Sequence, residues 1–365
     1  MNTSVKRVPI PKNGVDYRGK VVLAPMVRSG ELPSRLLALH YGADLVWGPE
    51  TIDKSMIGTT KRTNPVSSTI DYTRTPTNSS RTQGSAARES YIYRLHPARE
   101  SRRLIFQIGT SSPSTAVEAA KLVAPHVAGI DVNAGCPKPF STSGGMGAAL
   151  LQKPDHLASI LSALVKEVGE VFEIGISVKI RLLETAEKTE ALVRKLCGTG
   201  ITGLTIHCRT TPMRPRERAI RDQLQMITDV CRIEGVACVM NGDVKNRDEA
   251  LQLMREFGAD GAMIASAAEA NPSSFRTSEE GGLSAWREVV HDYMKIAVEV
   301  DNKWGNTKFT LSQLIPGKLG IYRDVTGSKS YFGVCEALGL EYLCDQAREV
   351  DARLGLPTSR DATAV

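Results

Sequence analysis

The stretch Gly-Ile-Asp-Val-Asn-Ala-Gly-Cys-Pro-Lys, residues 129–138, is the one around which this sequence is organised. Ile130 and Val132, between small and polar neighbours, are typical of a short buried strand. The strand should end near Asn133, and Pro137 has no N–H with which to continue a ladder, so Cys136 is predicted to lie in a loop at the strand's exit. Barrel enzymes carry their reacting groups at such exits. The alternative is that Cys136 is a small buried hydrophobe, the commoner state of a free cysteine.

The composition is that of an ordinary globular protein with room for more than one domain. The chain has 365 residues, of which 41% are hydrophobic and 24% charged, and this length suits a barrel of ~250 residues plus a smaller domain of ~80. No apolar run approaches the ~20 residues that a membrane span needs. The net charge of +6 permits a nucleic-acid partner without requiring one.

The seven cysteines argue against a disulfide framework or a zinc site. Their number is odd, they are scattered through apolar contexts, and no Cys-x-x-Cys pair occurs. We therefore expect no bound metal and a reducing compartment, namely the cytoplasm, with the nucleus as a second location.

Short apolar runs recur along most of the chain, and sequence with helical spacing follows most of them. The runs predicted as strands are 20–26, 44–50, 103–109, 129–133, 176–181, 203–209, 236–243 and 261–266. The helices predicted between them are 32–41, 115–124, 154–168, 185–197, 220–231 and 246–257. Eight such units predict an α/β fold of the (β/α)₈, or TIM-barrel, type. A doubly wound sheet is the alternative, but it usually shows a glycine fingerprint after the first strand, which ends here in Ala24-Pro25-Met26.

The domain boundaries follow from changes in this pattern. Residues 1–282 are predicted to form the catalytic barrel, interrupted at 58–101 by a polar surface insertion that is mostly loop, with an accessory strand at 91–95. After Gly281-Gly282 the spacing becomes purely helical, over 284–304, 307–322 and 335–354, so residues 283–356 should form a small helical domain. Residues 357–365 are interpreted as a flexible tail.

Polar, glycyl or prolyl residues stand at the carboxyl ends of the predicted strands. They are Ala24-Pro25-Met26, Gln107, Asn133 with Cys136, Lys179 with Arg181, His207 with Arg209, Asn241-Gly242-Asp243 and Ala265-Ser266. Considered alone, His207 is interpreted as a core histidine whose ring nitrogens have partners. Lys179 is interpreted as a side chain that extends to the rim of the barrel. Together, at one end of a barrel, they predict a site.

The residue types indicate a phosphate-bearing heteroaromatic cofactor, for which flavin mononucleotide (FMN) is the best fit. Lys179 and His207 can donate to anionic or carbonyl oxygens, and Gln107 can both donate and accept along a heterocycle edge. The loops after strands seven and eight, around 241–243 and 265–266, are where barrels commonly bind phosphate. No neighbouring base in the sequence would activate Cys136, so a thiol near its ordinary pKa of ~8.5 favours a proton donor over an attacking thiolate.

The sequence resembles the tRNA-dihydrouridine synthases, and in particular the eukaryotic subgroup that acts at uridine 20 of the tRNA D-loop. The motifs that carry the resemblance cover the whole predicted barrel in order: Ala24-Pro25-Met26, Asp131-Val-Asn-Ala-Gly-Cys-Pro137, Gly144-Gly-Met-Gly-Ala-Ala-Leu150, Val178-Lys-Ile-Arg181, Ile206-His-Cys-Arg209 and Asn241-Gly-Asp243. The helical region after residue 283 resembles that family's tRNA-binding domain.

The resemblance implies an RNA-binding flavoprotein oxidoreductase of tRNA processing that reduces the C5=C6 bond of uridine, with NADPH as co-substrate and Cys136 as proton donor. The implied cofactor contacts are Pro25, Met26, Gln107, Lys179, His207, Asn241, Gly242, Asp243, Ala265 and Ser266. The implied substrate contacts are Asn133, Lys179, Arg181 and Arg209. Basic residues of the helical domain would face tRNA, namely Lys303, Lys308, Lys318, Arg323 and Lys329. No membrane and no obligate protein partner are implied.

One departure bears on the cofactor. Many family members have an arginine where Ser266 stands, so one charge beside the cofactor phosphate is missing. Two other readings therefore stay open: a flavin barrel oxidoreductase acting on a small molecule, and a non-catalytic tRNA-binding protein whose barrel holds no flavin.

Overall fold

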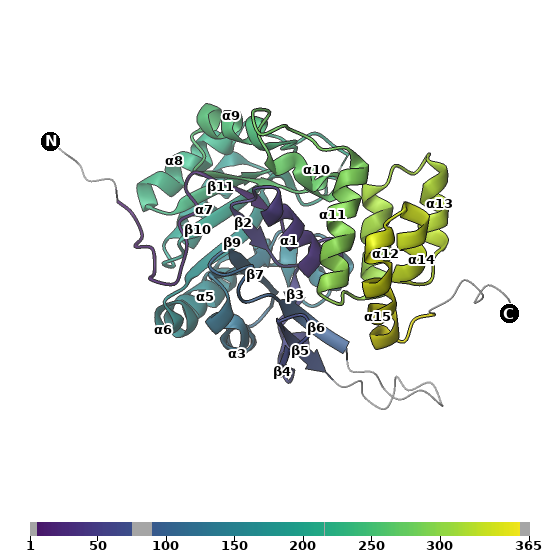
Figure 1. Cartoon of the computed structure of the whole chain (residues 1–365). Helices are drawn as coiled ribbons and strands as arrows, with labels where there is room; N and C mark the ends of the chain where they lie inside the picture. The colour runs from purple at the N-terminus through teal and green to yellow at the C-terminus, as the bar shows by residue number, and fades with distance from the viewer. Residues whose placement is uncertain (1–5, 75–89, 215, 358–365) are drawn as a thin grey trace.

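The structure, a computed structural model, describes residues 6–74, 90–214 and 216–357. Its centre is a closed barrel of parallel strands, in the order β2-β1-β12-β11-β10-β9-β8-β7, which the pairing of β2 with β7 closes (Figure 1). The strands are β1 Lys20–Leu23, β2 Leu45–Trp47, β7 Leu104–Gly109, β8 Gly129–Ala134, β9 Gly175–Leu182, β10 Gly203–Thr210, β11 Ala237–Asn241 and β12 Gly261–Ile264. The predicted TIM barrel is confirmed, with each predicted strand in place.

Six helices of the α/β units cover the outside of the barrel. They are α1 Leu32–His40, α3 Pro113–Val123, α5 Pro154–Leu164, α7 Ala186–Cys197, α8 Leu224–Glu234 and α9 Arg247–Phe257. Two begin at capping side chains, because Thr185 accepts a hydrogen bond from the Lys188 N–H and Asn246 accepts one from the Glu249 N–H. A five-residue π-helix, Val165–Gly169, and the short α6, Glu170–Phe172, continue α5.

The prediction for α8 was four residues too early. The segment before Leu224 is held at the barrel mouth instead: the Ile220 N–H donates to the Cys208 carbonyl at 2.7 Å, and the Ala219 N–H donates to the Asp243 carboxylate at 2.6 Å. These bonds give the backbone partners outside a helix, so the apolar spacing from residue 220 onward does not become helical until Leu224.

Short elements lie in the connections between the strands and helices of the barrel. They are β3 Thr51–Ile52, which pairs with the end of β7, and then α2 Asp53–Met56, η2 Ala124–His126, α4 Pro139–Thr142, η3 Gly147–Gln152, α10 Ser266–Ala270 and η5 Pro272–Phe275.

The insertion after β2 is better ordered than its composition indicated. Strands β4 Thr60–Asn64, β5 Thr69–Arg74 and β6 Ser90–Leu95 form an antiparallel sheet. The predicted accessory strand is β6, whereas β4 and β5 were interpreted as loop. Ile70, Tyr72, Tyr93 and Leu95 bury their side chains in the main barrel core, so the sheet is anchored although its other residues are polar. The predicted loop at 75–89 lies outside the described residues.

The C-terminal helices pack against the barrel through α1. They are α11 Trp286–Glu299, α12 Trp304–Leu314, α13 Gly320–Gly327, α14 Tyr331–Leu338, η6 Glu341–Leu343 and α15 Cys344–Leu354. They divide the three predicted runs into shorter helices. Leu36 and Tyr41 of α1 share one apolar core with Val289 and Tyr293 of α11, and Figure 1 shows α11 beside α1. No helix among the described residues is long and apolar enough to cross a membrane.

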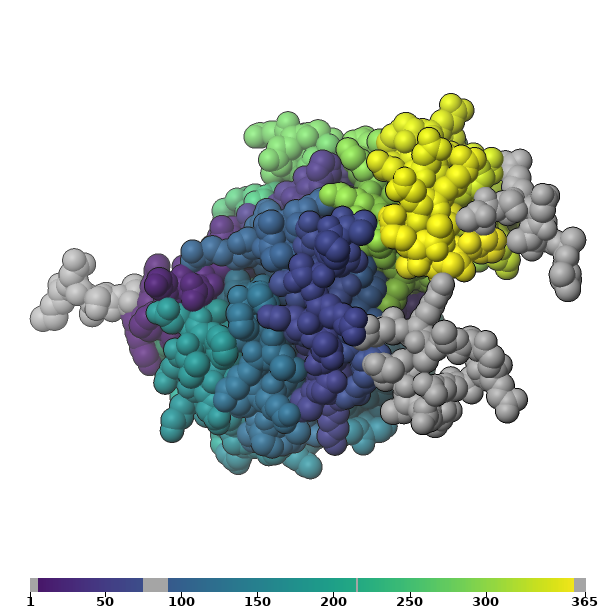
Figure 2. Space-filling model, turned by 60° about the horizontal axis from the view of Figure 1, so that its bottom comes forward, coloured from purple at the N-terminus to yellow at the C-terminus, as the bar shows by residue number. Residues whose placement is uncertain are grey.

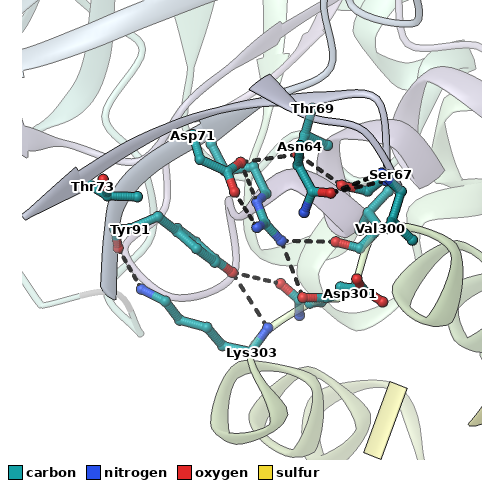
Figure 3. Close-up of polar contacts among 12 residues, drawn as sticks. Asn64, Ser67, Thr69, Asp71, Thr73, Tyr91, Val300, Asp301 and Lys303 are labelled. Carbon is teal, nitrogen blue, oxygen red and sulfur yellow. Dashed lines mark hydrogen bonds and ion pairs between the residues drawn. The ribbon is translucent and has the colours of Figure 1, made fainter. Parts of the chain in front are cut away.

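A buried polar cluster, here called the interdomain clamp, joins the insertion sheet to the C-terminal helices (Figure 3). It consists of Asp71, Tyr91, Arg94, Asp301 and Lys303. The Arg94 guanidinium pairs with Asp71 and donates to the Val300 and Asp301 carbonyls at 2.8 and 3.1 Å. Lys303 Nζ donates to the Tyr91 carbonyl at 2.6 Å. Figure 2 shows the insertion strands in dark blue and the C-terminal helices in yellow on one face of the molecule.

Candidate active site

The pairing register of the barrel strands places most of the predicted site residues at the same height along the barrel axis. Asn133 pairs with Lys179 between β8 and β9, and His207 pairs with both Arg181 and Asn241 across β9, β10 and β11. All lie at the carboxyl ends of their strands. The predicted convergence is therefore present for these residues.

The loop that carries Cys136 is built by Asn133. The Asn133 Oδ1 accepts hydrogen bonds from the Gly135 and Cys136 N–H groups at 2.9 and 3.0 Å, which folds the chain back at the strand's end. The Cys136 carbonyl accepts from the Ala148 N–H at 2.9 Å. At Gly147, where φ is +56°, a Cβ would lie 2.6 Å from that carbonyl, so this close approach requires glycine.

The thiol of Cys136 is half-buried, and burial raises its pKa. Arg181 lies near enough to oppose this rise, but burial is the larger effect. The group is therefore protonated at neutral pH, as a proton donor must be.

Gln107 is oriented by a buried carboxylate. Its Nε2 donates to Asp131 Oδ2 at 2.8 Å, and Ser177 Oγ donates to Asp131 Oδ1 at 2.7 Å. Because Nε2 is engaged, the amide oxygen of Gln107 is left to accept from a ligand. Burial raises the pKa of Asp131 to about 6, and the bonds from Gln107 and Ser177 partly offset that rise.

Lys179 carries a partly buried ammonium, which has one hydrogen-bond partner among the described residues. Its Nζ donates to Asn241 Oδ1 at 3.0 Å, and Asn241 Nδ2 in turn donates to the Met263 carbonyl at 3.0 Å. Within the described part of the chain Lys179 forms no salt bridge. Burial, with the nearby Arg181 charge, lowers its pKa to about 8. Its remaining N–H groups suit an anionic or carbonyl oxygen of a ligand.

His207 is neutral, and its tautomer follows from its neighbour. Arg209 Nη1 can only donate, so at 3.1 Å the His207 Nε2 must accept, which leaves Nδ1–H as the donor. Burial, followed by the charges of Lys179, Arg181 and Arg209, lowers the pKa of His207 to about 2.

The two arginines are engaged within the protein. Arg209 pairs with Asp243 at 2.5 Å and donates to the Glu217 carbonyl at 2.7 Å. Arg181 donates to the Gly135 and Thr210 carbonyls at 2.7 and 3.1 Å, and so braces the cysteine loop. Arg209 thus holds His207 and Asp243 in place, and its predicted contact with the substrate stays a prediction.

The other predicted cofactor residues line the same mouth. Pro25, Met26 and Ala265 are half-buried after their strands, and Ser266 is exposed at the start of α10. Gly242 has a φ of +128°, which few other residues adopt, and it lets the turn between Asn241 and Asp243 present its backbone closely to a ligand.

Sequence reasoning missed Glu50 and Ser141. Ser141 Oγ donates to Glu50 Oε1 at 3.0 Å, next to the cysteine loop. Glu50 stands at the end of the second predicted strand, so the rule that found the other residues also applied to it. Ser141 carried no signal, because it lies in a polar loop among similar residues.

At the carboxyl end of this parallel barrel lie a protonated cysteine on a loop, a lysine and a neutral histidine. Such a group of side chains at the strand exits is the active site of a barrel enzyme. The chain belongs to the dihydrouridine synthase (Dus) family, whose sequence profile matches residues 22–313.

Two yeast relatives share this similarity over most of the chain. The sequence is 47% identical to "tRNA-dihydrouridine(20) synthase [NAD(P)+]" of Schizosaccharomyces pombe, over 92% of this chain and 68% of that protein. It is 44% identical to the Saccharomyces cerevisiae protein of the same name, over 88% of this chain and 82% of that protein. Among solved structures, DHODH from Eimeria tenella in complex with ferulenol is 17% identical, with a TM-score of 0.48 over 77% of this chain and 86% of that chain.

Proposed function

We propose that this protein is a tRNA-dihydrouridine(20) synthase, which uses FMN and NADPH to reduce the C5=C6 bond of uridine 20 in the tRNA D-loop. The observation that carries the proposal is the 47% identity to a yeast protein of that name over 92% of the chain. The arrangement of Cys136, Lys179 and His207 at one end of the barrel supports it. The free cysteines favour a reducing compartment, the cytoplasm.

The residues at the barrel mouth fit FMN. Lys179 offers unpaired N–H groups, His207 offers Nδ1–H, and Gln107 offers an acceptor oxygen, as a ring with carbonyl and imide groups requires. The backbone at Gly242 and near Ser266 would hold the phosphate. Bound there, FMN would supply the hydride that the reaction adds to C6 of the uracil.

Cys136 would supply the proton. Hydride addition at C6 leaves negative charge on the uracil, which must be quenched by a proton at C5, and a protonated thiol held on a loop over the site can give it. Asn133 has its Nδ2 group left to donate to the uracil, since its Oδ1 holds the loop. Lys179 and Arg181 would stabilise charge that develops on the uracil oxygens.

We expect the double variant Lys179→Ala/His207→Ala to purify colourless but folded. The change removes the two donors that face the ring, whereas Asn241 keeps its bond to the Met263 carbonyl. The check is the ratio of flavin absorbance to protein absorbance, with circular dichroism to confirm the fold. Retention of a full flavin complement would defeat the placement of the cofactor.

The RNA-binding surface that we propose contains fewer basic residues than the sequence predicted. Lys318, Arg323 and Lys329 are exposed on the helical domain. Lys303 instead donates to the Tyr91 carbonyl, and Lys308 donates to the Ser328 carbonyl at 3.3 Å. The first three are therefore the ones we assign to phosphate contacts.

Replacing Lys318, Arg323 and Lys329 together by alanine should weaken tRNA binding without loss of flavin. The slope of log K against log salt should become shallower by ~0.7 to 0.9 for each phosphate that no longer meets a cationic side chain. Filter binding over a salt series measures it. Lys166→Ala, an exposed lysine on the opposite end of the barrel, is the matched control and should leave the slope unchanged. An equal slope in both variants would mean that these helices do not bind RNA.

A further inference from the structure

Glu50 lies at the catalytic end of the barrel, and the reaction proposed above gives this residue no role. It lies between β2 and β3, and β3 pairs with β7 so that Ile52 faces Gly109. The Glu50 Oε1 accepts from Ser141 Oγ at 3.0 Å. A Cβ on residue 109 would lie 2.6 Å from that same oxygen, so glycine at this strand end leaves the room that the carboxyl fills.

The second carboxyl oxygen has no partner. Glu50 Oε2 is buried, and no described group forms a hydrogen bond of good geometry with it. The side chains of Asn133 and Cys136 lie close enough to the Glu50 carboxyl to act on its charge. A buried polar atom without a partner is rare in proteins and unfavourable, so its presence beside a reacting group needs an explanation.

Two acids therefore meet at this point, and burial makes each of them easier to protonate than it is in water. Burial raises the pKa of Glu50, and the bond from Ser141 only partly offsets this. Burial also raises the pKa of Cys136, and the Glu50 carboxyl adds to that rise because two adjacent negative charges repel. Two cationic side chains also act here: Arg181 lowers the pKa of the thiol, and Lys179 interacts with Cys136 as well.

We propose that Glu50 returns a proton to Cys136 after each turnover, an inference that rests on the proposed function. In the reaction the Cys136 S–H bond breaks, its proton forms the new C–H bond at C5, and the thiolate keeps the electron pair. The Glu50 O–H bond then breaks, its proton restores the S–H bond, and the carboxylate takes a replacement proton from water. The unpaired Oε2 is the atom free to carry that proton toward the sulfur. Glu50 acts through Cys136 and touches neither cofactor nor uracil in this role.

The first test measures how Glu50 affects the reactivity of Cys136 in the absence of turnover. Cys136 alkylation by iodoacetamide is followed by peptide mass spectrometry over a pH series, in Glu50→Gln, in Glu50→Asp and in wild type. At pH values where Glu50 is ionised, Glu50→Gln removes the negative charge that disfavours the thiolate, so Cys136 should react several-fold faster on the alkaline side of the series. Glu167→Gln, an exposed glutamate on the π-helix, is the matched control. An unchanged pH profile in Glu50→Gln would overturn the contact.

The second test separates the first turnover from later ones. Pre-reduced Glu50→Gln holds Cys136 already protonated, so its first oxidation by unmodified tRNA should run at the wild-type rate. Its steady-state rate should fall about 10²-fold, and a small weak acid such as imidazolium should restore it in proportion to its concentration. Glu50→Asp should recover part of the rate.

The outcomes distinguish the two proposals. A wild-type steady-state rate in Glu50→Gln, or an equal slowing of its first and later turnovers, would show that Glu50 is only structural and would overturn the relay. A wild-type first turnover in Cys136→Ala would instead overturn the role of Cys136, whatever the alkylation profile says of Glu50.

Discussion

Cys136→Ala is expected to slow the oxidation of the reduced protein by unmodified tRNA by about 10²–10⁴-fold, the usual contribution of a positioned acid. Reduction by NADPH should stay near the wild-type rate, because the residues that face the cofactor, Gln107, Lys179 and His207, are left in place. Stopped-flow flavin absorbance measures both half-reactions separately.

The matched control for this variant is Cys344→Ala. Cys344 is also a half-buried free cysteine, but it begins α15 in the helical domain. It should leave both half-reactions unchanged. A wild-type rate of oxidation by tRNA in Cys136→Ala would return that residue to the status of a structural thiol.

Arg94→Met is expected to lower the free energy of unfolding by about 3–5 kcal/mol, as breaking a buried ion pair does. The Arg94 and Asp71 side chains are 7% and 10% exposed, so the substitution leaves the Asp71 charge buried without its partner. It also removes the donors to the Val300 and Asp301 carbonyls, which join the insertion sheet to the end of α11. Equilibrium urea unfolding gives the change.

The same interface offers a matched control in Arg99, which pairs with Glu299 at 2.9 Å in an exposed position. Arg99→Met should cost less than about 1 kcal/mol, since water screens such pairs. The double variant Asp71→Leu/Arg94→Met should be more stable than Arg94→Met alone, because it leaves no unpaired charge. If Arg94→Met cost no more than Arg99→Met, the interdomain clamp would contribute nothing to stability.

The barrel and most of its site could be predicted from the sequence because both follow from short-range rules. Buried parallel strands read as apolar runs, and the carboxyl ends of those strands converge in any closed barrel. Lys179, His207 and Asn241 were found in this way, without knowledge of their contacts.

What escaped prediction depends on contacts between distant segments. Asp131 could be read only as part of a strand, and its bond to Gln107 depends on the barrel register. The insertion strands β4 and β5 are rich in threonine and charged residues, and only their packing on the barrel makes Ile70 and Tyr72 core residues. The ion pair between Arg209 and Asp243 was also missed, because nothing in the local sequence reveals it.

The central claim, reduction of uridine 20, is tested most directly by product analysis. Purified protein is incubated with FMN, NADPH and an unmodified tRNA transcript, and nuclease fragments are then sequenced by mass spectrometry. The account predicts a gain of two hydrogens on the uridine at position 20 of the D-loop, which requires NADPH and is abolished in Cys136→Ala. A fragment at position 20 with unchanged mass, or a gain at a different uridine, would contradict it.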